Sequence, residues 1–390
     1  MMQIAILGST GAIGKTTLKI INKDKKNFKI ILLSTNKNAK KILEQAKKYK
    51  VKNVIISNKS IKNKWEVRFK QYKIKTYDNF DIFKKIFKKK LNYVINAISG
   101  IEGLSPTIGI IKFTKKIAIA NKESIICGWN LINKELKKNK TKFIPVDSEH
   151  FSIYKLLEKE NIKNVKEVII TASGGPFLKK SLRSNKIKVK DALKHPNWKM
   201  GKKITIDSST LVNKVFETIE AKKIFNLNFK KLKILINPNS YVHAIIIFKN
   251  GTIKILAHET NMDIPIFNSI YDKNSFNFYK NNSINLIKIN NLNLSKPNIK
   301  KFYTLNILNK MPPNDTLFET ILISVNDELV NMFLNKKINY EKISFYLMKI
   351  IKFKIFKKYY NIQPKSVKQI YEVRNFARGV VQNYVKENYL

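Results

Sequence analysis

Two carboxylates stand close together in the segment 145–150, which reads PVDSEH. Asp147 and Glu149 follow a short apolar run, KFIPV, of the kind that forms buried strands. Residues two apart in an extended chain project to the same side, and two like charges held together repel unless a proton or cation lies between them. The pair is therefore a candidate cation site at the carboxyl end of a strand, where ligands bind in α/β sheets. A loop with two solvated acids is the alternative.

A third carboxylate lies in the segment 207–221, DSSTLVNKVFETIEA. Ser208 is expected as an N-cap or loop residue ahead of a helix, and on that helix Asn213, Lys214 and Glu217 lie on one arc. The opposite arc carries four apolar residues that predict its buried side: Val212, Val215, Phe216 and Ile219. Three oxygen ligands would suit Mg²⁺ or Mn²⁺ and not zinc. A solvated helix face would show the same pattern, so this helix alone does not decide the question.

Two further segments could contact an anionic substrate. The string ITASGGPF predicts a strand that ends at Ser173-Gly174-Gly175, where backbone amides can approach an anion, although a plain turn is the alternative. His195 opens the segment HPNWKMGKK, which shows little regular pattern. Its Trp198 and Met200 fit either a buried plug or a lid over a substrate.

A glycine-rich turn near the N-terminus predicts a nucleotide site. In AILGSTGAIGKTTL, Gly8, Gly11 and Gly14 follow the apolar run IAIL and open the helical stretch KTTLKIIN. A Walker loop needs a glycine five positions before Gly14, where Ser9 stands instead. The spacing favours the turn that holds the pyrophosphate of a dinucleotide, with a tight turn that binds nothing as the alternative.

The end of the second apolar run indicates which dinucleotide is bound. An NAD enzyme carries Asp or Glu there to hold the ribose hydroxyls. This chain reads LLSTNKN, with Lys37 and no carboxylate. A cation suits the 2′-phosphate and favours NADP, whereas an ordinary surface lysine is the alternative.

The elements that must position these residues follow from the spacing of apolar runs. Residues 1–146 alternate such runs with lysine-rich amphipathic stretches, a pattern typical of βαβ units and a Rossmann-like parallel sheet. In 147–272 the runs continue as EVIITASGG, KITIDSST, KILINPNS and HAIIIFKNGTIKILA, the last a hairpin that turns at KNG. Residues 273–298, rich in Asn and Ser, predict a linker, and 299–390 predict helices. We therefore expect an α/β protein with a C-terminal helical domain.

Composition bounds the possible functions. A chain of 390 residues with 44% hydrophobic content is long enough for two or three domains and excludes a disordered protein. The single cysteine, Cys127, excludes a disulfide framework, and no apolar run is long enough to span a membrane. With a first strand starting by Gln3, we expect no signal peptide and a cytoplasmic location. The net charge of +49 raises nucleic-acid binding as an alternative, but the lysines are spread evenly and no nucleic-acid-reading motif occurs.

Seven strings together resemble one family, 1-deoxy-D-xylulose 5-phosphate reductoisomerase of the non-mevalonate isoprenoid pathway. They are ILGSTGAIG, ANKES, PVDSEH, SGGPF, HPNWKMGKKI, DSSTLVNKVFETIEA and NPNSYVHA, in the family's order across about residues 1–270. The C-terminal third resembles the family only through NDELV near residue 328. The resemblance implies an NADPH-binding domain, a central catalytic and dimerisation domain, a helical domain, and a homodimer. It also implies metal- and NADPH-dependent rearrangement and reduction of 1-deoxy-D-xylulose 5-phosphate to 2-C-methyl-D-erythritol 4-phosphate.

The resemblance further implies roles for individual residues. The metal ligands would be Asp147, Glu149 and Glu217, and the catalytic residues Lys122, Glu149 and Lys214. The substrate contacts would be Ser148, Glu149, Ser173, His195, Ser208, Asn213, Lys214 and Glu217. The cofactor contacts would be Thr10, Gly11, Ala12, Ile13, Asn36, Lys37, Asn38, Asn121, Lys122, Glu123, Gly201 and Met262. Trp198 and Met200 would belong to a lid.

Four positions depart from the family pattern. Asn36 and Val215 stand where glycine is usual, and Thr260 and Asp263 replace a usual proline and arginine. None of them removes a metal ligand or a phosphate contact implied by the resemblance. A plain NADP-dependent dehydrogenase without the isomerase step remains the alternative enzyme.

Overall fold

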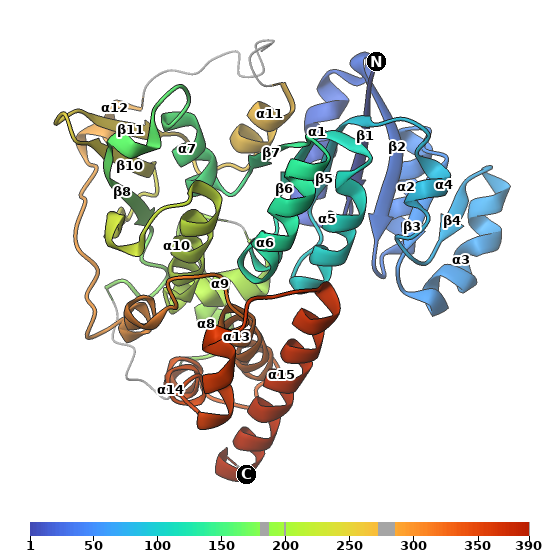
Figure 1. Cartoon of the computed structure of the whole chain (residues 1–390). Helices are drawn as coiled ribbons and strands as arrows, with labels where there is room; N and C mark the ends of the chain where they lie inside the picture. The colour runs from blue at the N-terminus through green and yellow to red at the C-terminus, as the bar shows by residue number, and fades with distance from the viewer. Residues whose placement is uncertain (180–186, 199, 272–284, 390) are drawn as a thin grey trace. The chain divides into compact units, whose positions relative to one another are not determined.

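The structure is a computed structural model that describes residues 1–179, 187–198, 200–271 and 285–389 (Figure 1). Contacts divide the chain into two units. The first contains residues 1–124 and 131–151 together with Met262–Tyr271 of the described chain. The second contains 125–130, 152–261 and the described C-terminal part. In the described ranges no helix is both long and apolar enough to span a membrane.

The first unit is built on a parallel sheet of seven strands in the order β4-β3-β2-β1-β5-β6-β7. Their bounds are Met2–Leu7 (β1), Phe28–Thr35 (β2), Asn53–Ile56 (β3), Lys75–Tyr77 (β4), Leu91–Asn96 (β5), Thr114–Ile119 (β6) and Lys142–Pro145 (β7). Strand order reverses between β1 and β5, so the carboxyl ends of these two strands flank a switch point. This confirms the predicted Rossmann-like sheet.

Amphipathic helices connect the strands of the first unit, as the lysine-rich stretches predict. They are Ala12–Lys23 (α1), Ala39–Lys48 (α2), Lys59–Gln71 (α3), Phe83–Ile86 (α4), Leu104–Ile111 (α5) and Lys122–Lys138 (α6). The helix Ser148–Leu156 (α7) begins in this unit directly after β7. Apolar side chains such as Ile6, Ile20 and Ile42 are fully buried in the shared core.

The helix Asp263–Tyr271 (α11) belongs to the first unit, whereas the sequence places it in the domain 147–272. Ile266, Phe267 and Ile270 are buried in the core of that unit. The Tyr93 hydroxyl lies 2.7 Å from Ser269 Oγ. The predicted boundary follows chain order, which does not reveal a segment that returns to an earlier core.

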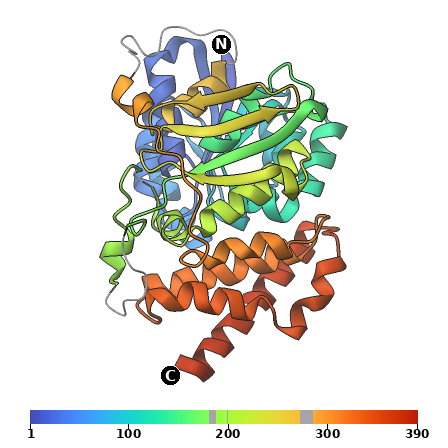
Figure 2. The same ribbon diagram turned by 90° about the vertical axis from the view of Figure 1, so that its left-hand side faces the viewer.

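The second unit contains a sheet of four strands in the order β11-β10-β8-β9 (Figure 2). The bounds are Val165–Ala172 (β8), Leu232–Ile236 (β9), Val242–Phe248 (β10) and Ile253–Ala257 (β11). The antiparallel pair β10–β11 confirms the predicted hairpin, and Gly251 adopts φ +87° in its turn. The other two pairings join β8 antiparallel to β10 and parallel to β9.

Helices make up the rest of the second unit. Their bounds are Val189–Ala192 (α8), Lys202–Ser209 (α9), Val212–Phe225 (α10), Leu286–Asn290 (α12), Phe318–Leu334 (α13), Tyr340–Ile350 (α14) and Val367–Tyr389 (α15). The last three confirm the predicted helical region, and α13 packs against both α14 and α15 (Figure 2). Because α13 is covered in this way, nearly all of its residues are buried.

Two predictions of local structure differ from the structure. The run KITIDSST forms α9 and not a strand, because Thr205–Ser209 are all buried and the Thr205 hydroxyl donates to the Gly201 carbonyl oxygen. Packing of these buried residues within the second unit outweighs the local β preference of the β-branched residues Ile204, Thr205 and Ile206. The predicted linker 273–298 lies partly outside the described residues, and its described part contains α12 and a bridge from Ser295 to Ile236.

Candidate active site

The glycine turn between β1 and α1 brings backbone unusually close to backbone. Gly8 adopts φ +81°, and a Cβ atom there would lie 2.6 Å from the Ala97 carbonyl oxygen. A Cβ atom at Gly14 would lie 2.5 Å from the Gly8 carbonyl oxygen. Gly11 is the N-cap of α1, whose free amide groups favour an anion. The turn therefore has the backbone geometry of a pyrophosphate site at the switch point.

The loop after β2 is exposed at Asn36, Lys37 and Asn38 and is fixed from both sides. The Asn38 side chain accepts a hydrogen bond from the Lys41 amide at 3.2 Å and so caps α2. The Asn36 amide donates to Ser57 Oγ at 2.9 Å, a partner that the sequence did not indicate. This arrangement presents Lys37 at the carboxyl edge of the sheet, where a 2′-phosphate would need a cation.

The segment ANKES, residues 120–124, follows β6 at the carboxyl edge of the first sheet and contacts the acidic pair through Lys122. Asn121 caps α6 by accepting from the Ser124 amide at 2.7 Å, and its own amide donates to the Ile98 and Gly100 carbonyl oxygens. Lys122 is buried, and its Nζ lies 2.8 Å from Asp147 Oδ2. This contact joins two of the predicted site residues and could not be inferred from their spacing in the sequence.

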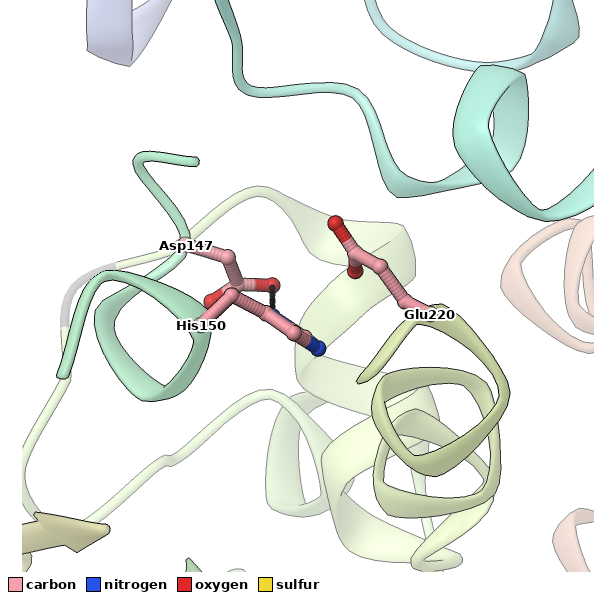
Figure 3. A group of neighbouring side chains, drawn as sticks. All are labelled: Asp147, His150 and Glu220. Carbon is pink, nitrogen blue, oxygen red and sulfur yellow. Dashed lines mark ion pairs between the residues drawn. The ribbon is translucent and has the colours of Figure 1, made fainter. Parts of the chain in front are cut away.

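The acidic pair lies on a strand-to-helix junction and not in extended chain. Asp147 follows β7, while Glu149 lies in the first turn of α7, where the helix N-terminus stabilises negative charge. Ser148 Oγ donates to Glu149 Oε2 at 2.5 Å. Figure 3 shows His150 beside Asp147, with 3.9 Å between His150 Nδ1 and Asp147 Oδ2, and also draws Glu220 of α10. Both acids thus face donors or cations already within the first unit.

In the second unit, Ser173, His195 and Ser208 form one hydrogen-bonded group. His195 Nε2 lies 3.0 Å from Ser173 Oγ and 3.2 Å from Ser208 Oγ. His195 Nδ1 accepts from the backbone amides of Asn197 and Trp198, at 3.2 and 3.0 Å, so the ring proton resides on Nε2. Burial lowers the pKa of His195 to about 4. At neutral pH this group is an uncharged set of donors.

The turn after β8 supports the same group. Gly174 and Gly175 adopt φ +83° and +67°, and a Cβ atom at Gly175 would lie 2.8 Å from the Ser208 carbonyl oxygen. The Gly175 amide donates to Ser173 Oγ at 3.1 Å. The glycines therefore allow the turn to approach the end of α9.

The helix α10 carries the predicted arc of Asn213, Lys214 and Glu217. Lys214 and Glu217 form an ion pair, and the Asn213 amide donates to Glu217. Lys214 and Glu217 are both buried, which excludes the alternative of a solvated face. Val215 lies on the buried apolar side with Val212, Phe216 and Ile219, so its departure from glycine is accommodated in the core.

Two further predicted cofactor residues each lie directly before a helix of their own unit. Gly201 is the exposed N-cap of α9, and Met262 packs against the core of the first unit just before α11. Trp198 contacts His243 edge-on at 6.1 Å, and His243 stacks on His258 at 3.8 Å. This stacked pair could not be inferred from the sequence, although His243 lies in the string NPNSYVHA.

Comparison with known proteins identifies the family. The model of 1-deoxy-D-xylulose 5-phosphate reductoisomerase matches residues 4–128, and two models of its C-terminal domain match 143–225 and 258–380. The reductoisomerase of Pelagibacter ubique is 54% identical over 380 residues, which cover 97% of this chain and 98% of the relative. That of Clostridium novyi is 35% identical, with full coverage of both chains.

Solved structures agree over the full length. The reductoisomerase of Zymomonas mobilis in complex with NADPH has a TM-score of 0.88 at 27% identity, covering 100% of both chains. A reductoisomerase in complex with NADPH, fosmidomycin and magnesium has a TM-score of 0.91 at 26% identity, covering 99% of this chain and 98% of the other. The family that the motifs indicate is thereby confirmed, and the chain belongs to the 1-deoxy-D-xylulose 5-phosphate reductoisomerase family.

Proposed function

We propose that this protein converts 1-deoxy-D-xylulose 5-phosphate to 2-C-methyl-D-erythritol 4-phosphate, using NADPH and Mg²⁺ or Mn²⁺. The observation that carries the proposal is the contact of 2.8 Å between Lys122 Nζ and Asp147 Oδ2. It joins an acidic pair suited to a cation with a lysine at the carboxyl edge of a dinucleotide-binding sheet. A plain dehydrogenase needs the sheet but has no use for the acidic pair.

We propose Asp147, Glu149 and Glu217 as the metal ligands. Hard divalent cations prefer such an all-oxygen set. Each carboxylate already attracts a positive or donating group, namely Lys122, Ser148 and Lys214 respectively. The donor set therefore fits the cation, which when bound polarises the substrate's carbonyl and hydroxyl oxygens.

The substrate phosphate would be held chiefly by two serine hydroxyls and by the positive charge of one lysine. Ser173 and Ser208 supply hydroxyls, and neutral His195 aligns both through Nε2. Lys214 supplies positive charge, and Asn213 and Ser148 supply further hydrogen bonds to the substrate. Lys122, buried beside Asp147, is suited to hold a proton near a substrate oxygen at the reacting centre.

The cofactor would lie along the carboxyl edge of the first sheet. The backbone of Thr10–Ile13 would hold the pyrophosphate, and Lys37 with Asn38 the 2′-phosphate, with Asn36 alongside. The further proposed contacts are Asn121, Lys122, Glu123, Gly201 and Met262. We propose that Trp198 and Met200 close over the substrate and exclude water during reduction.

We also propose that the enzyme is a cytoplasmic homodimer. The sheet edge formed by β11 exposes Ile253 and Ile255, at 58% and 49% of their surface, and exposed apolar edges favour pairing with another chain. A second copy of this chain has the same exposed β11 edge and could pair with it across a two-fold axis. Sedimentation equilibrium should give twice the mass of the chain, and a monomer at micromolar concentration would contradict the proposal.

NADPH oxidation with 1-deoxy-D-xylulose 5-phosphate tests the proposed function. We expect turnover with added Mn²⁺ or Mg²⁺, loss of turnover with a chelator, and recovery when metal is restored. Product analysis must show the rearranged carbon skeleton. Metal-independent turnover, or a reduced product with the original skeleton, would instead favour the plain dehydrogenase.

A further inference from the structure

The helix α13, most of which is buried, carries three consecutive polar residues. Asn326, Asp327 and Glu328 form the start of the string NDELV. None of the three is among the residues proposed to bind the metal, the substrate or the cofactor. Asn326 and Glu328 are buried, and burial of such groups is unfavourable unless they are hydrogen-bonded.

Two of the three residues hold the end of α9. The Asn326 amide donates to Asp207 Oδ1 at 2.8 Å. Lys203 Nζ lies 2.8 Å from Asp207 Oδ2 and 2.9 Å from Asp327 Oδ1, and so links the two carboxylates. Asp207 is 1% exposed, so its charge depends on these partners for stabilisation.

Residues next to Asp207 in the sequence also form hydrogen bonds with the C-terminal part of the chain. Tyr340 Oη lies 2.9 Å from Ser209 Oγ, and Thr304 Oγ1 donates to the Thr210 carbonyl oxygen at 2.8 Å. Three of the four residues 207–210 are thus tied to the region after residue 299. The fourth, Ser208, directs its hydroxyl to His195 at 3.2 Å.

We propose that Asn326 is a positioning residue for the substrate phosphate, acting through Asp207 on Ser208. The inference rests on the proposed function, in which Ser208 contacts that phosphate. The helical region then contributes to substrate affinity without touching the substrate. Loss of the hydrogen bond from Asn326 to Asp207 would let the end of α9 shift. The hydrogen bond between Ser208 and His195 would then be weakened.

The test compares two single variants of the full chain on the same helix. Asn326→Ala removes the hydrogen bond to Asp207. Glu328→Gln is the matched control, because Glu328 is equally buried but binds Arg378 and Gln382 of α15, each at 2.8 Å. Both variants should lower the melting temperature. Only Asn326→Ala should raise the KM for 1-deoxy-D-xylulose 5-phosphate, on the order of tenfold, with the KM for NADPH unchanged.

A swapped pair tests the hydrogen bond itself. Asp207→Asn combined with Asn326→Asp reverses donor and acceptor and should recover most of the lost substrate affinity. An unchanged substrate KM in an active Asn326→Ala enzyme would overturn the inference, as would equal KM changes in the control.

A second measurement separates this inference from the proposed function. Stabilisation by millimolar inorganic phosphate, followed by thermal shift, needs no turnover. It should be weaker in Asn326→Ala than in Glu328→Gln. Lack of turnover in the unmodified protein would refute the proposed function, whereas equal phosphate stabilisation in both variants would refute the positioning role.

Discussion

His195 contacts two serine hydroxyls through one ring nitrogen and two backbone amides through the other. This arrangement uses the neutral ring, since protonation would place a proton on Nδ1, where two amides donate. The low pKa of His195 has the same consequence: the ring stays neutral and aligns the two serines, and in the proposed site Lys214 would supply the positive charge for the phosphate.

The low pKa of His195 predicts a pH dependence of stability. Its ordinary pKa of 6.5 falls to about 4 in the folded protein, so the unfolded chain binds more protons between these values. The free energy of unfolding should therefore fall as the pH drops through this window. Urea denaturation of the protein and of His195→Gln should show a smaller loss in the variant. Parallel pH profiles for the two proteins would contradict the assignment.

Asp147 provides a second prediction at the scale of the residue. Asp147→Asn keeps the shape of the side chain but removes the charge that faces Lys122. We expect turnover to fall at least about a hundredfold, a barrier change of roughly 3 kcal/mol, and Mn²⁺ binding measured by electron paramagnetic resonance to weaken. Glu44→Gln is the control, because Glu44 pairs with Lys41 on the surface of α2. Undiminished Mn²⁺ binding in Asp147→Asn would remove Asp147 from the ligand set.

At the scale of the element, the glycine turn and α9 differ in how far sequence predicts them. Gly11 and Gly14 approach atoms of their own turn, so the glycine spacing was sufficient to predict that turn, whereas the approach of Gly8 to Ala97 could not be read from it. The helix α9 was missed because its stability comes from burial by distant segments, such as Asn326 on Asp207. The contact of Lys122 with Asp147 was missed for the same reason, since it joins the ends of separate strands.

The glycine turn also predicts the effect of a single methyl group. Gly14→Ala would bring a Cβ atom within 2.5 Å of both the Gly8 carbonyl oxygen and Ser9 Cα. We expect the turn to shift, with a loss of stability of about 1–3 kcal/mol and a KM for NADPH raised about tenfold or more. Gly379→Ala in α15 is the control, because its Cβ atom meets nothing within 4 Å. It should stabilise the helix by about 0.5–1 kcal/mol, and equal effects of the two changes would contradict the steric argument.

At the scale of the whole molecule, the chain carries a net charge of +49, and both proposed ligands, the sugar phosphate and NADPH, are anions. A positive surface raises the local concentration of negatively charged substrate, and salt screens that attraction. We expect kcat/KM for the sugar phosphate to fall severalfold between about 0.05 and 0.5 M NaCl. Sucrose of matching osmolarity should have little effect. If kcat/KM did not change with NaCl concentration, the positive charge would play no part in the binding of the sugar phosphate.

The family and, apart from α9, the order of elements could be predicted from sequence, but the return of α11 to the first unit could not. The motifs fall in chain order, so a boundary drawn at residue 146 or 272 was the natural choice. Which segments share a core depends on side chains such as Ile266 and Phe267. Both are buried in a core that also contains Ile4 and other residues more than two hundred positions earlier in the chain.

The return of α11 bears on how this enzyme could be rebuilt or recombined. Lys19 Nζ pairs with Asp263 Oδ2 at 2.6 Å and Tyr271 donates to Asp24, so two ends of one cofactor-binding body are encoded far apart. A gene fragment that stops after β7 would leave the surface for α11 bare. To exchange the cofactor-binding unit with that of a relative, both the N-terminal segment and α11 must therefore be replaced together. Inheritance of this unit as one contiguous block of sequence is structurally disfavoured.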